Sequence, residues 1–334
     1  MSKQPRKTPE SRLVEIDGIT YLLVDGKLLR YADLTFDKGF KIVLGCIGSE
    51  EVLKRLLNRL LGTSIVHLEY RNTEHPGMTE DERSSRFDVY CEDETGRCFQ
   101  VEMQNWSQKH YFKRAIYYSS LVLLDQVAKE HMKIRMAPGK KWDYDFQPLY
   151  VVSFINFKNQ YSVNEDSMIR LNPYISTYRY ADIETRKELS NSTNLVFIDL
   201  YSFDKKEEEC VSLEDIWMYS IKNMHTLLAC PERFMGTEVE DLYFKSELAK
   251  MKMEQRKKYE EEVMTRNDIL NSIAEQLEDA RKEAAKIGEA EGRAEGRAEG
   301  KAEIIRHLHS KEMSAEDIAE LLDIELETIT QVLQ

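Results

Sequence analysis

The stretch RSSRFDVYCEDETGRCFQVEMQ holds the residues of this chain that are best suited to chemistry. Gln100, Glu102 and Gln104 alternate with apolar residues, and alternate side chains of a β-strand point to the same face. The segment DETG precedes this strand and indicates a hairpin turn, so Asp88 falls on the neighbouring strand. The sequence therefore predicts that the carboxylates of Asp88 and Glu102 face each other across paired strands.

Two facing carboxylates offer oxygen ligands to a hard cation. Mg²⁺ suits such a pair, with Mn²⁺ as a substitute, because it needs only one or two carboxylates together with water and substrate phosphate. A metal bound there can polarise a scissile phosphate and lower the pKa of an attacking water. The same alternation is common on half-solvated strands, so the pattern alone leaves a purely structural interpretation open.

Several predicted elements must position this hairpin. Residues 13–31 contain two Asp-Gly pairs among alternating apolar residues, which is typical of a β-hairpin or meander. Residues 37–61 show helical spacing, as a short helix interrupted by glycines and a second helix capped by Ser49. Further strands are predicted over Ile65–Tyr70, Phe87–Glu92, Cys98–Gln104, Leu149–Asn156 and Asn194–Leu200, and further helices over residues 109–129 and 213–235.

The bulk composition favours a globular protein, with 42% hydrophobic and 32% charged residues in 334. The sequence has no apolar run of the roughly 18 residues that a membrane span needs, and the polar, basic start has no secretory signal. Five scattered cysteines without a CxxC motif fit a reducing cytoplasm, where we expect the protein. The net charge is −13, but residues 241–334 carry 15 basic and 23 acidic residues, which leaves −5 for residues 1–240.

The composition changes near Leu242, where long charged helices begin. A four-residue repeat, GEAEGRAEGRAEGKAE, is followed by two short amphipathic helices, the first with Ser314 as N-cap. We expect this tail to promote homo-oligomer formation and to be dispensable for folding of the core. The predicted domains are a hairpin extension (1–32), a core (33–240), a charged helical region (241–303) and a small helical pair (304–334).

Four blocks of the chain closely resemble the Rpn family of recombination-promoting nucleases in the PD-(D/E)XK superfamily. They are DKGFKIVLG, LLNRLLG, FDVYCEDETGRCFQVEMQ and FKRAIYYSS, in matching order and spacing. Looser similarity continues to about Met235. The resemblance implies an α/β, restriction-endonuclease-like fold, in which helices flank a central mixed sheet and a helical extension follows. It also implies an Mg²⁺-dependent endonuclease that acts on DNA and is linked to recombination or mobile elements.

Carried over from the family, Asp88 and Glu102 become the motif acids and metal ligands. Gln104 takes the position of the lysine in the superfamily's name, although similar members also have glutamine there. The resemblance leaves the cationic role open, with Lys41 as first candidate and Arg114 as second. Asp37 matches the family's first-helix acid and shares a helix face with Lys41; an ordinary surface ion pair is the alternative interpretation.

Arg114 and Tyr117 follow the hairpin on the next predicted helix. We expect Arg114 to contact substrate phosphate and Tyr117 to line the cleft. The alternative is that Tyr117 or Tyr118 packs in the core. At the level of the whole chain, the alternative to a nuclease is a catalytically silent nuclease fold that binds nucleic acid or protein; the presence of both Asp88 and Glu102 argues against it.

Overall fold

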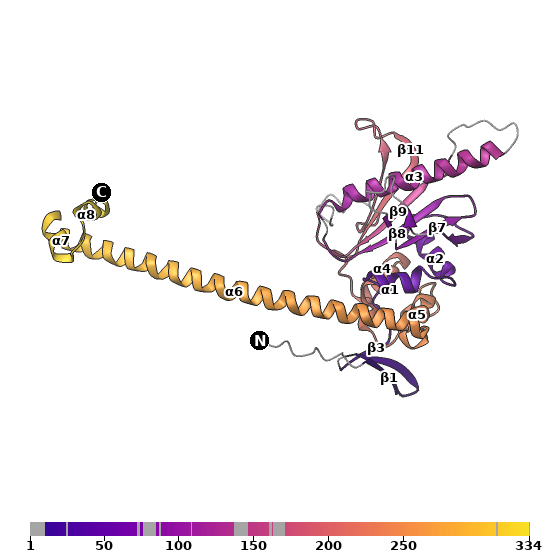
Figure 1. Ribbon diagram of the computed structural model, residues 1–334, viewed down its shortest axis with the longest axis horizontal. Helices are drawn as coiled ribbons and strands as arrows, with labels where there is room; N and C mark the ends of the chain where they lie inside the picture. The colour runs from indigo at the N-terminus through magenta and orange to yellow at the C-terminus, as the bar shows by residue number, and fades with distance from the viewer. Residues whose placement is uncertain are drawn as a thin grey trace. The chain divides into compact units, whose positions relative to one another are not determined.

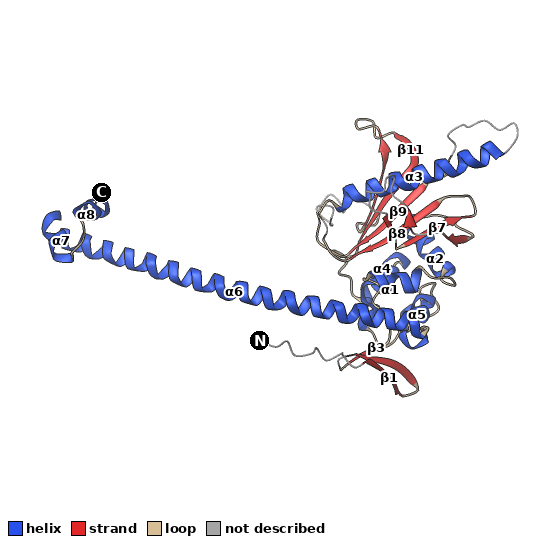
Figure 2. Ribbon diagram, in the orientation of Figure 1, coloured by secondary structure: helices blue, strands red, loops and turns tan. Residues whose placement is uncertain are grey.

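The computed structural model divides the chain into two compact units, Met1–Glu262 and Val263–Gln334 (Figure 1). It describes residues 11–24, 26–71, 74–75, 85–86, 88–107, 109–136, 146–159, 162, 171–311 and 313–333. The first unit is an α/β structure and the second is helical, as the colouring by secondary structure shows (Figure 2). The start of the predicted strand at Phe87 lies outside the described residues.

A six-stranded mixed sheet forms the centre of the first unit, in the order β10-β11-β9-β8-β7-β4. The β8–β9 and β9–β11 pairs are parallel, whereas β4, β7 and β10 pair antiparallel with their neighbours. The strands are β4 (Leu68–Tyr70), β7 (Val89–Asp93), β8 (Cys98–Gln104), β9 (Leu149–Ile155), β10 (Ile175–Ala181) and β11 (Glu188–Asp199). A separate pair joins β5 (Glu74–His75) to β6 (Ser85–Arg86).

Helices cover both faces of this sheet, because its central strands are apolar on both sides. Helix α3 (Tyr111–Met136) packs on the face that carries Val151 and Ile155. Helix α1 (Asp37–Leu44) packs on the opposite face, where the rings of Phe40 and Phe154 lie 5.6 Å apart. The predicted mixed sheet flanked by helices is therefore confirmed.

Two helices, α2 (Glu50–Leu61) and α5 (Glu240–Ser246), pack against α1, and α4 (Leu213–Asn223) packs against α2. The apolar spacing of α2 buries one face, and the helix ends at Gly62, whose φ of 63° suits a residue without a Cβ. Short 3₁₀ turns occupy Glu207–Glu209, Met224–Thr226, Glu232–Phe234 and Leu248–Lys250.

The predicted N-terminal meander is confirmed as a three-stranded antiparallel sheet of β1 (Ser11–Ile16), β2 (Ile19–Val24) and β3 (Lys27–Leu29). Its Leu22 and Val24 are buried, and Arg30 just after it bonds Glu247 at 3.1 Å. The meander therefore packs with residues near the end of the first unit.

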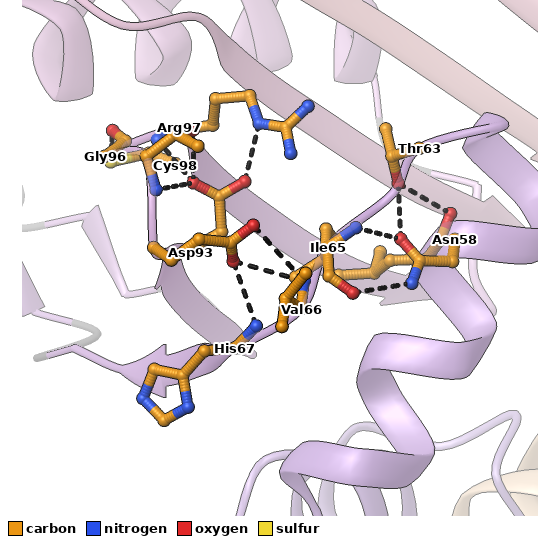
Figure 3. A network of polar contacts seen from close by, with 12 residues as sticks. Asn58, Thr63, Ile65, Val66, His67, Asp93, Gly96, Arg97 and Cys98 are labelled. Carbon is orange, nitrogen blue, oxygen red and sulfur yellow. Dashed lines mark hydrogen bonds and ion pairs between the residues drawn. The ribbon is translucent and has the colours of Figure 1, made fainter.

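Side chains fix the turns around the β7–β8 hairpin (Figure 3). The buried carboxylate of Asp93 accepts hydrogen bonds from the backbone of Thr95 and Arg97 and pairs with the Arg97 guanidinium. On α2, the amide of Asn58 exchanges hydrogen bonds with both backbone groups of Ile65. The Asp93 bonds fix the turn between β7 and β8, and the Asn58 bonds fix the connection from α2 to β4.

The structure corrects three expectations. The helix predicted over 213–235 ends at Asn223, and Pro231, which cannot continue a helix, follows the next turn. Strand β10 was not predicted, because its largely exposed residues lack an alternating apolar pattern. The compact first unit runs past the predicted core boundary at residue 240 to Glu262, and Leu242 and Leu248 are fully buried in it, so we expect the core to need residues up to Glu262.

The second unit contains most of α6 (Met253–His309), then α7 (Ala315–Leu322) and α8 (Leu326–Leu333). Ile305, Ile318 and Ile329 form its small buried cluster. The predicted N-cap is confirmed, because the Ser314 hydroxyl accepts the backbone N–H of Asp317 at 3.1 Å. Among the residues that the structure describes, no helix is both long and apolar enough to cross a membrane.

Candidate active site

A cavity of about 390 Å³ opens where α1, the β7–β8 hairpin and the first turns of α6 meet. Its lining is mostly polar. It includes Asp37, Lys41, Asp88, Gln104, Trp106 and Glu262. Four of the residues predicted from the sequence to form the site therefore share one cavity with residues that the sequence did not indicate.

Asp88 immediately precedes β7, opposite the motif strand. Val89 pairs with Val101 in the β7–β8 ladder, so the same register places Asp88 opposite Glu102. One carboxylate oxygen of Asp88, Oδ2, accepts the backbone N–H of Met103 at 2.8 Å. The other, Oδ1, lies 3.1 Å from Nζ of Lys41. The hairpin thus fixes the Asp88 carboxylate from one side while α1 contacts it from the other.

Lys41 lies between two carboxylates. Its Nζ is 2.7 Å from Oδ1 of Asp37, one turn earlier on α1, in addition to its contact with Asp88. The side chain of Asp37 is 51% exposed, whereas that of Asp88 is only 10% exposed. The Asp37–Lys41 pair is therefore more than a surface ion pair, because it extends to the buried motif acid.

The electrostatics of this triad follow from burial and charge. Burial, together with the neighbouring Asp37 carboxyl, raises the pKa of Asp88 to about 8. Burial alone would raise the pKa of Asp37, but hydrogen bonds with Asp88 and Lys41 lower it. Burial alone would lower the pKa of Lys41, but Asp88 and Asp37 raise it, so the ammonium stays charged. The protonation of Asp37 and that of Asp88 are therefore linked.

Glu102 occupies a different environment from Asp88. It is 6% exposed, faces α3, and is not among the described residues that line the cavity. Its Oε1 accepts a hydrogen bond from Gln100 at 2.8 Å, and its Oε2 accepts one from the Tyr111 hydroxyl at 3.4 Å. Burial raises the pKa of Glu102, against the opposing effect of Gln100.

Gln104 ends β8 at the cavity, where its Oε1 accepts a hydrogen bond from Arg114 at 3.4 Å. The Arg114 guanidinium also lies over the rings of Tyr111 and Tyr118. Arg114, the second cationic candidate, therefore lies beside β8. Lys41, the first candidate, is the one whose Nζ lies 3.1 Å from Oδ1 of Asp88.

Tyr117 and Tyr118 differ in placement. Tyr117 is 44% exposed on α3 and does not line the cavity. Tyr118 packs against the buried cluster of Tyr90, Val122 and Val151. Packing in the core, the alternative interpretation of these tyrosines, is thus confirmed for Tyr118. Tyr117 does not line the cavity as we expected.

The sequence did not indicate six residues of the cavity lining, which are Thr35, Phe36, Met103, Asn105, Trp106 and Glu262. Asn105 and Trp106 directly follow the motif strand, and Asn105 accepts a hydrogen bond from Asn156 after β9 at 2.7 Å. Their position next to Gln104 was an available signal. Glu262 lies on α6, far along the chain, and no local pattern connects it with the hairpin.

Residues 34–276 match the family model described as PD-(D/E)XK nuclease family transposase. The chain belongs to this family. No curated protein and no solved structure matches it. Membership of the PD-(D/E)XK nuclease family agrees with the mixed α/β fold and with the resemblance stated from the sequence, and it indicates a nuclease- or transposase-related role.

The donor set of the cavity suits a hard divalent cation. Every side-chain donor from Asp37, Asp88 and Gln104 that could serve is an oxygen, and Mg²⁺ prefers oxygen. The described part of the chain contains no cluster of three or more His, Cys, Asp or Glu side chains that could hold a metal ion. Mg²⁺ does not require such a cluster, since one or two carboxylates with water and phosphate suffice. Asp37 and Asp88 lie close together, which raises the pKa of Asp88. A bound cation would offset the negative charge of these two carboxylates.

Proposed function

We propose that this protein is a metal-dependent endonuclease that hydrolyses phosphodiester bonds of DNA, in a role linked to recombination or mobile elements. The observation that carries the proposal is the polar cavity in which Asp88, the motif acid of a PD-(D/E)XK chain, lies beside the charged amine of Lys41. Mg²⁺ is the proposed cofactor, and Mn²⁺ is a substitute. Asp88 is the proposed ligand that lines the cavity, whereas Glu102, the second predicted ligand, lies under α3 and would have to turn toward the cavity to bind the metal.

The metal, when bound, would supply Lewis-acid chemistry at the scissile phosphate. The protein's own residues have separable tasks. The Met103 N–H orients the Asp88 carboxylate, and Gln100 with Tyr111 orients Glu102 from the α3 side. Lys41 offers a positive charge next to Asp88, where it would stabilise negative charge developing on phosphate. It thereby takes the role that lysine has in the superfamily motif.

Gln104 and Arg114 would act on the substrate side of the same strand. The amide of Gln104 has both a donor and an acceptor, so it can orient a water or a phosphate oxygen but cannot supply charge. Arg114 is held over two tyrosine rings with its guanidinium toward Gln104, and a guanidinium suits phosphate contact. Tyr117 remains a proposed substrate contact from the exposed face of α3.

A supercoiled-plasmid nicking assay tests this function. We expect nicking with Mg²⁺ or Mn²⁺, none in EDTA, and none by Asp88→Ala or Glu102→Ala. Equal nicking by the wild type and both variants would identify a contaminating nuclease. DNA binding without nicking under any metal condition would favour the alternative, a silent nuclease fold that binds nucleic acid.

We also propose that the second unit promotes self-association. Its buried cluster of Ile305, Ile318 and Ile329 is small, while Leu321 and Leu326 are 61% and 43% exposed beside it. Sedimentation of the full chain and of a chain ending at residue 276, where the family match ends, would compare the association states. Identical association states would rule out this role.

A further inference from the structure

Helix α6 contacts the start of α1 through two side chains. Oε2 of Glu262 accepts the backbone N–H of Lys38 at 3.0 Å, and the hydroxyl of Tyr259 accepts the backbone N–H of Asp33 at 2.8 Å. Tyr259 and Glu262 are three residues apart, so they lie on one face of α6. Both belong to the first compact unit, although most of the helix belongs to the second.

The start of α1 needs such a contact. The first N–H groups of a helix have no partner within the helix, and a side chain at the N-cap usually satisfies one of them. The N-cap of α1 is Phe36, whose side chain makes no capping hydrogen bond. Glu262 therefore supplies the missing acceptor from a distant part of the chain, and its negative charge suits the positive end of the helix.

Close packing makes the position of α1 sensitive to this contact. A Cβ added to Gly39 would lie 2.0 Å from the carbonyl oxygen of Asp33 and 3.4 Å from Cε2 of Tyr259. Only glycine fits so close to another backbone segment. The first turn of α1 is thus seated directly on the segment that Tyr259 holds.

We propose that Glu262 is a positioning residue of the active site, which caps α1 and so holds Lys41 against Asp88. Lys38, whose N–H is capped, is one turn before Lys41, whose Nζ is 3.1 Å from Oδ1 of Asp88. A small displacement of α1 would separate these two groups, and displacement of catalytic groups is costly in rate. The predicted effect of Glu262 on cleavage rests on the proposed nuclease function. The capping of α1 by Glu262 is independent of that function.

The competing role is direct binding of metal by Glu262, which also lines the cavity. The two roles differ in what Glu262→Gln retains. Its amide oxygen can still accept the Lys38 N–H, but it is a neutral group and a poorer ligand for Mg²⁺. Glu262→Ala removes both roles, and Glu262→Asp keeps the charge on a side chain too short to reach Lys38.

The experiment compares these variants by two independent measurements. One is the steady-state nicking of supercoiled plasmid in Mg²⁺, resolved into kcat and KM. The other is hydrogen–deuterium exchange in the first turn of α1, which reports the Lys38 amide whether or not the protein cleaves DNA. Glu254→Ala is the matched control, because Glu254 lies on the same helix and pairs only with Lys258 at the surface among the contacts described.

We expect Glu262→Ala to speed exchange at the start of α1 and to lower kcat on the order of 10- to 100-fold, the range typical of residues that support a site indirectly. Glu262→Gln should restore slow exchange and most of the rate, and Glu254→Ala should match the wild type in both. If Glu262→Ala does not fold, Glu262→Asp replaces it with the same expectations.

Two results would overturn the proposal. One is wild-type exchange at α1 in Glu262→Ala or Glu262→Asp. The other is a loss of cleavage in Glu262→Gln as large as in Glu262→Ala with exchange unchanged, which would assign Glu262 to metal binding. A wild-type protein that cleaves no DNA would contradict the proposed function instead, and the exchange measurement would still decide whether Glu262 caps α1.

Discussion

The two motif carboxylates occupy opposite kinds of surroundings although they lie across one hairpin. Asp88 faces a polar cavity, where its partners are the charged amine of Lys41, the carboxyl of Asp37 and the backbone N–H of Met103. Glu102 lies under α3, where two neutral side chains, Gln100 and Tyr111, donate to it. The first arrangement concentrates charge that a ligand could offset, and the second holds a carboxylate in a fixed orientation. We therefore expect the buried Asp88 carboxylate to lower the stability of the metal-free protein and the hydrogen-bonded Glu102 carboxylate to raise it.

The largest expected effect is the loss of DNA cleavage when Asp88, the carboxylate in the cavity, is replaced. Asp88→Ala should lower the nicking rate on the order of 10³-fold or more, because no other described carboxylate takes its place beside Met103. Glu184→Ala, a change at an exposed carboxylate of the β10–β11 turn, is the control and should match the wild type. Comparable rates for all three proteins would remove Asp88 from the mechanism.

The next effect separates the two cationic candidates. Lys41→Met should lower the nicking rate on the order of 10²-fold, because it removes the charge beside Asp88. Arg114→Met should lower it less, since Arg114 donates to Gln104, whereas the charge 3.1 Å from Asp88 belongs to Lys41. Rates in the opposite order would transfer the cationic role to Arg114. Measuring both with a saturating substrate separates loss of chemistry from loss of binding.

Replacing Glu102 should lower the free energy of unfolding more than replacing Asp88. Glu102→Ala should lower the free energy of unfolding by about 1–3 kcal/mol, because Gln100 and Tyr111 lose a buried acceptor. Asp88→Ala should cost less or add stability, since it removes a carboxylate whose charged form is disfavoured by burial. Urea unfolding of both variants measures this. Equal losses would mean that the two environments do not differ energetically.

The smallest effect is on pH dependence without metal. The pKa of Asp88 is raised to about 8 in the folded protein, so between its ordinary pKa and 8 the folded state binds a proton that the unfolded state lacks. Asp88 therefore makes the metal-free protein less stable as the pH rises through that window. The melting temperature should fall by a few degrees, roughly, from pH 6 to pH 9 in EDTA. Mg²⁺ should reduce the fall, and Asp88→Asn should abolish this component; a fall of the same size in Asp88→Asn would assign it to other groups.

Local sequence was sufficient for the hairpin and its flanking helices. The alternation in β8 and the turn at Asp93 predicted the pairing of β7 with β8, and the ladder, which starts at Val89 and Val101, confirms it. The apolar spacing in α2 and the Ser314 cap were predicted for the same reason, because they depend on residues within a few positions of each other. The four-residue spacing of Asp37 and Lys41 likewise predicted their ion pair.

Only the tertiary structure decided which of these groups share an environment. Nothing in the alternation of β8 shows that α3 buries Glu102 while a cavity remains at Asp88, because that depends on which helix packs on which face. The meeting of Lys41 with Asp88, and of Glu262 with Lys38, joins segments far apart in sequence. The sequence determined each element and the identity of its polar residues, since those follow from short-range periodicity. The composition of the site was decided by long-range packing, which brings α1, β7–β8 and α6 together and which no local pattern encodes.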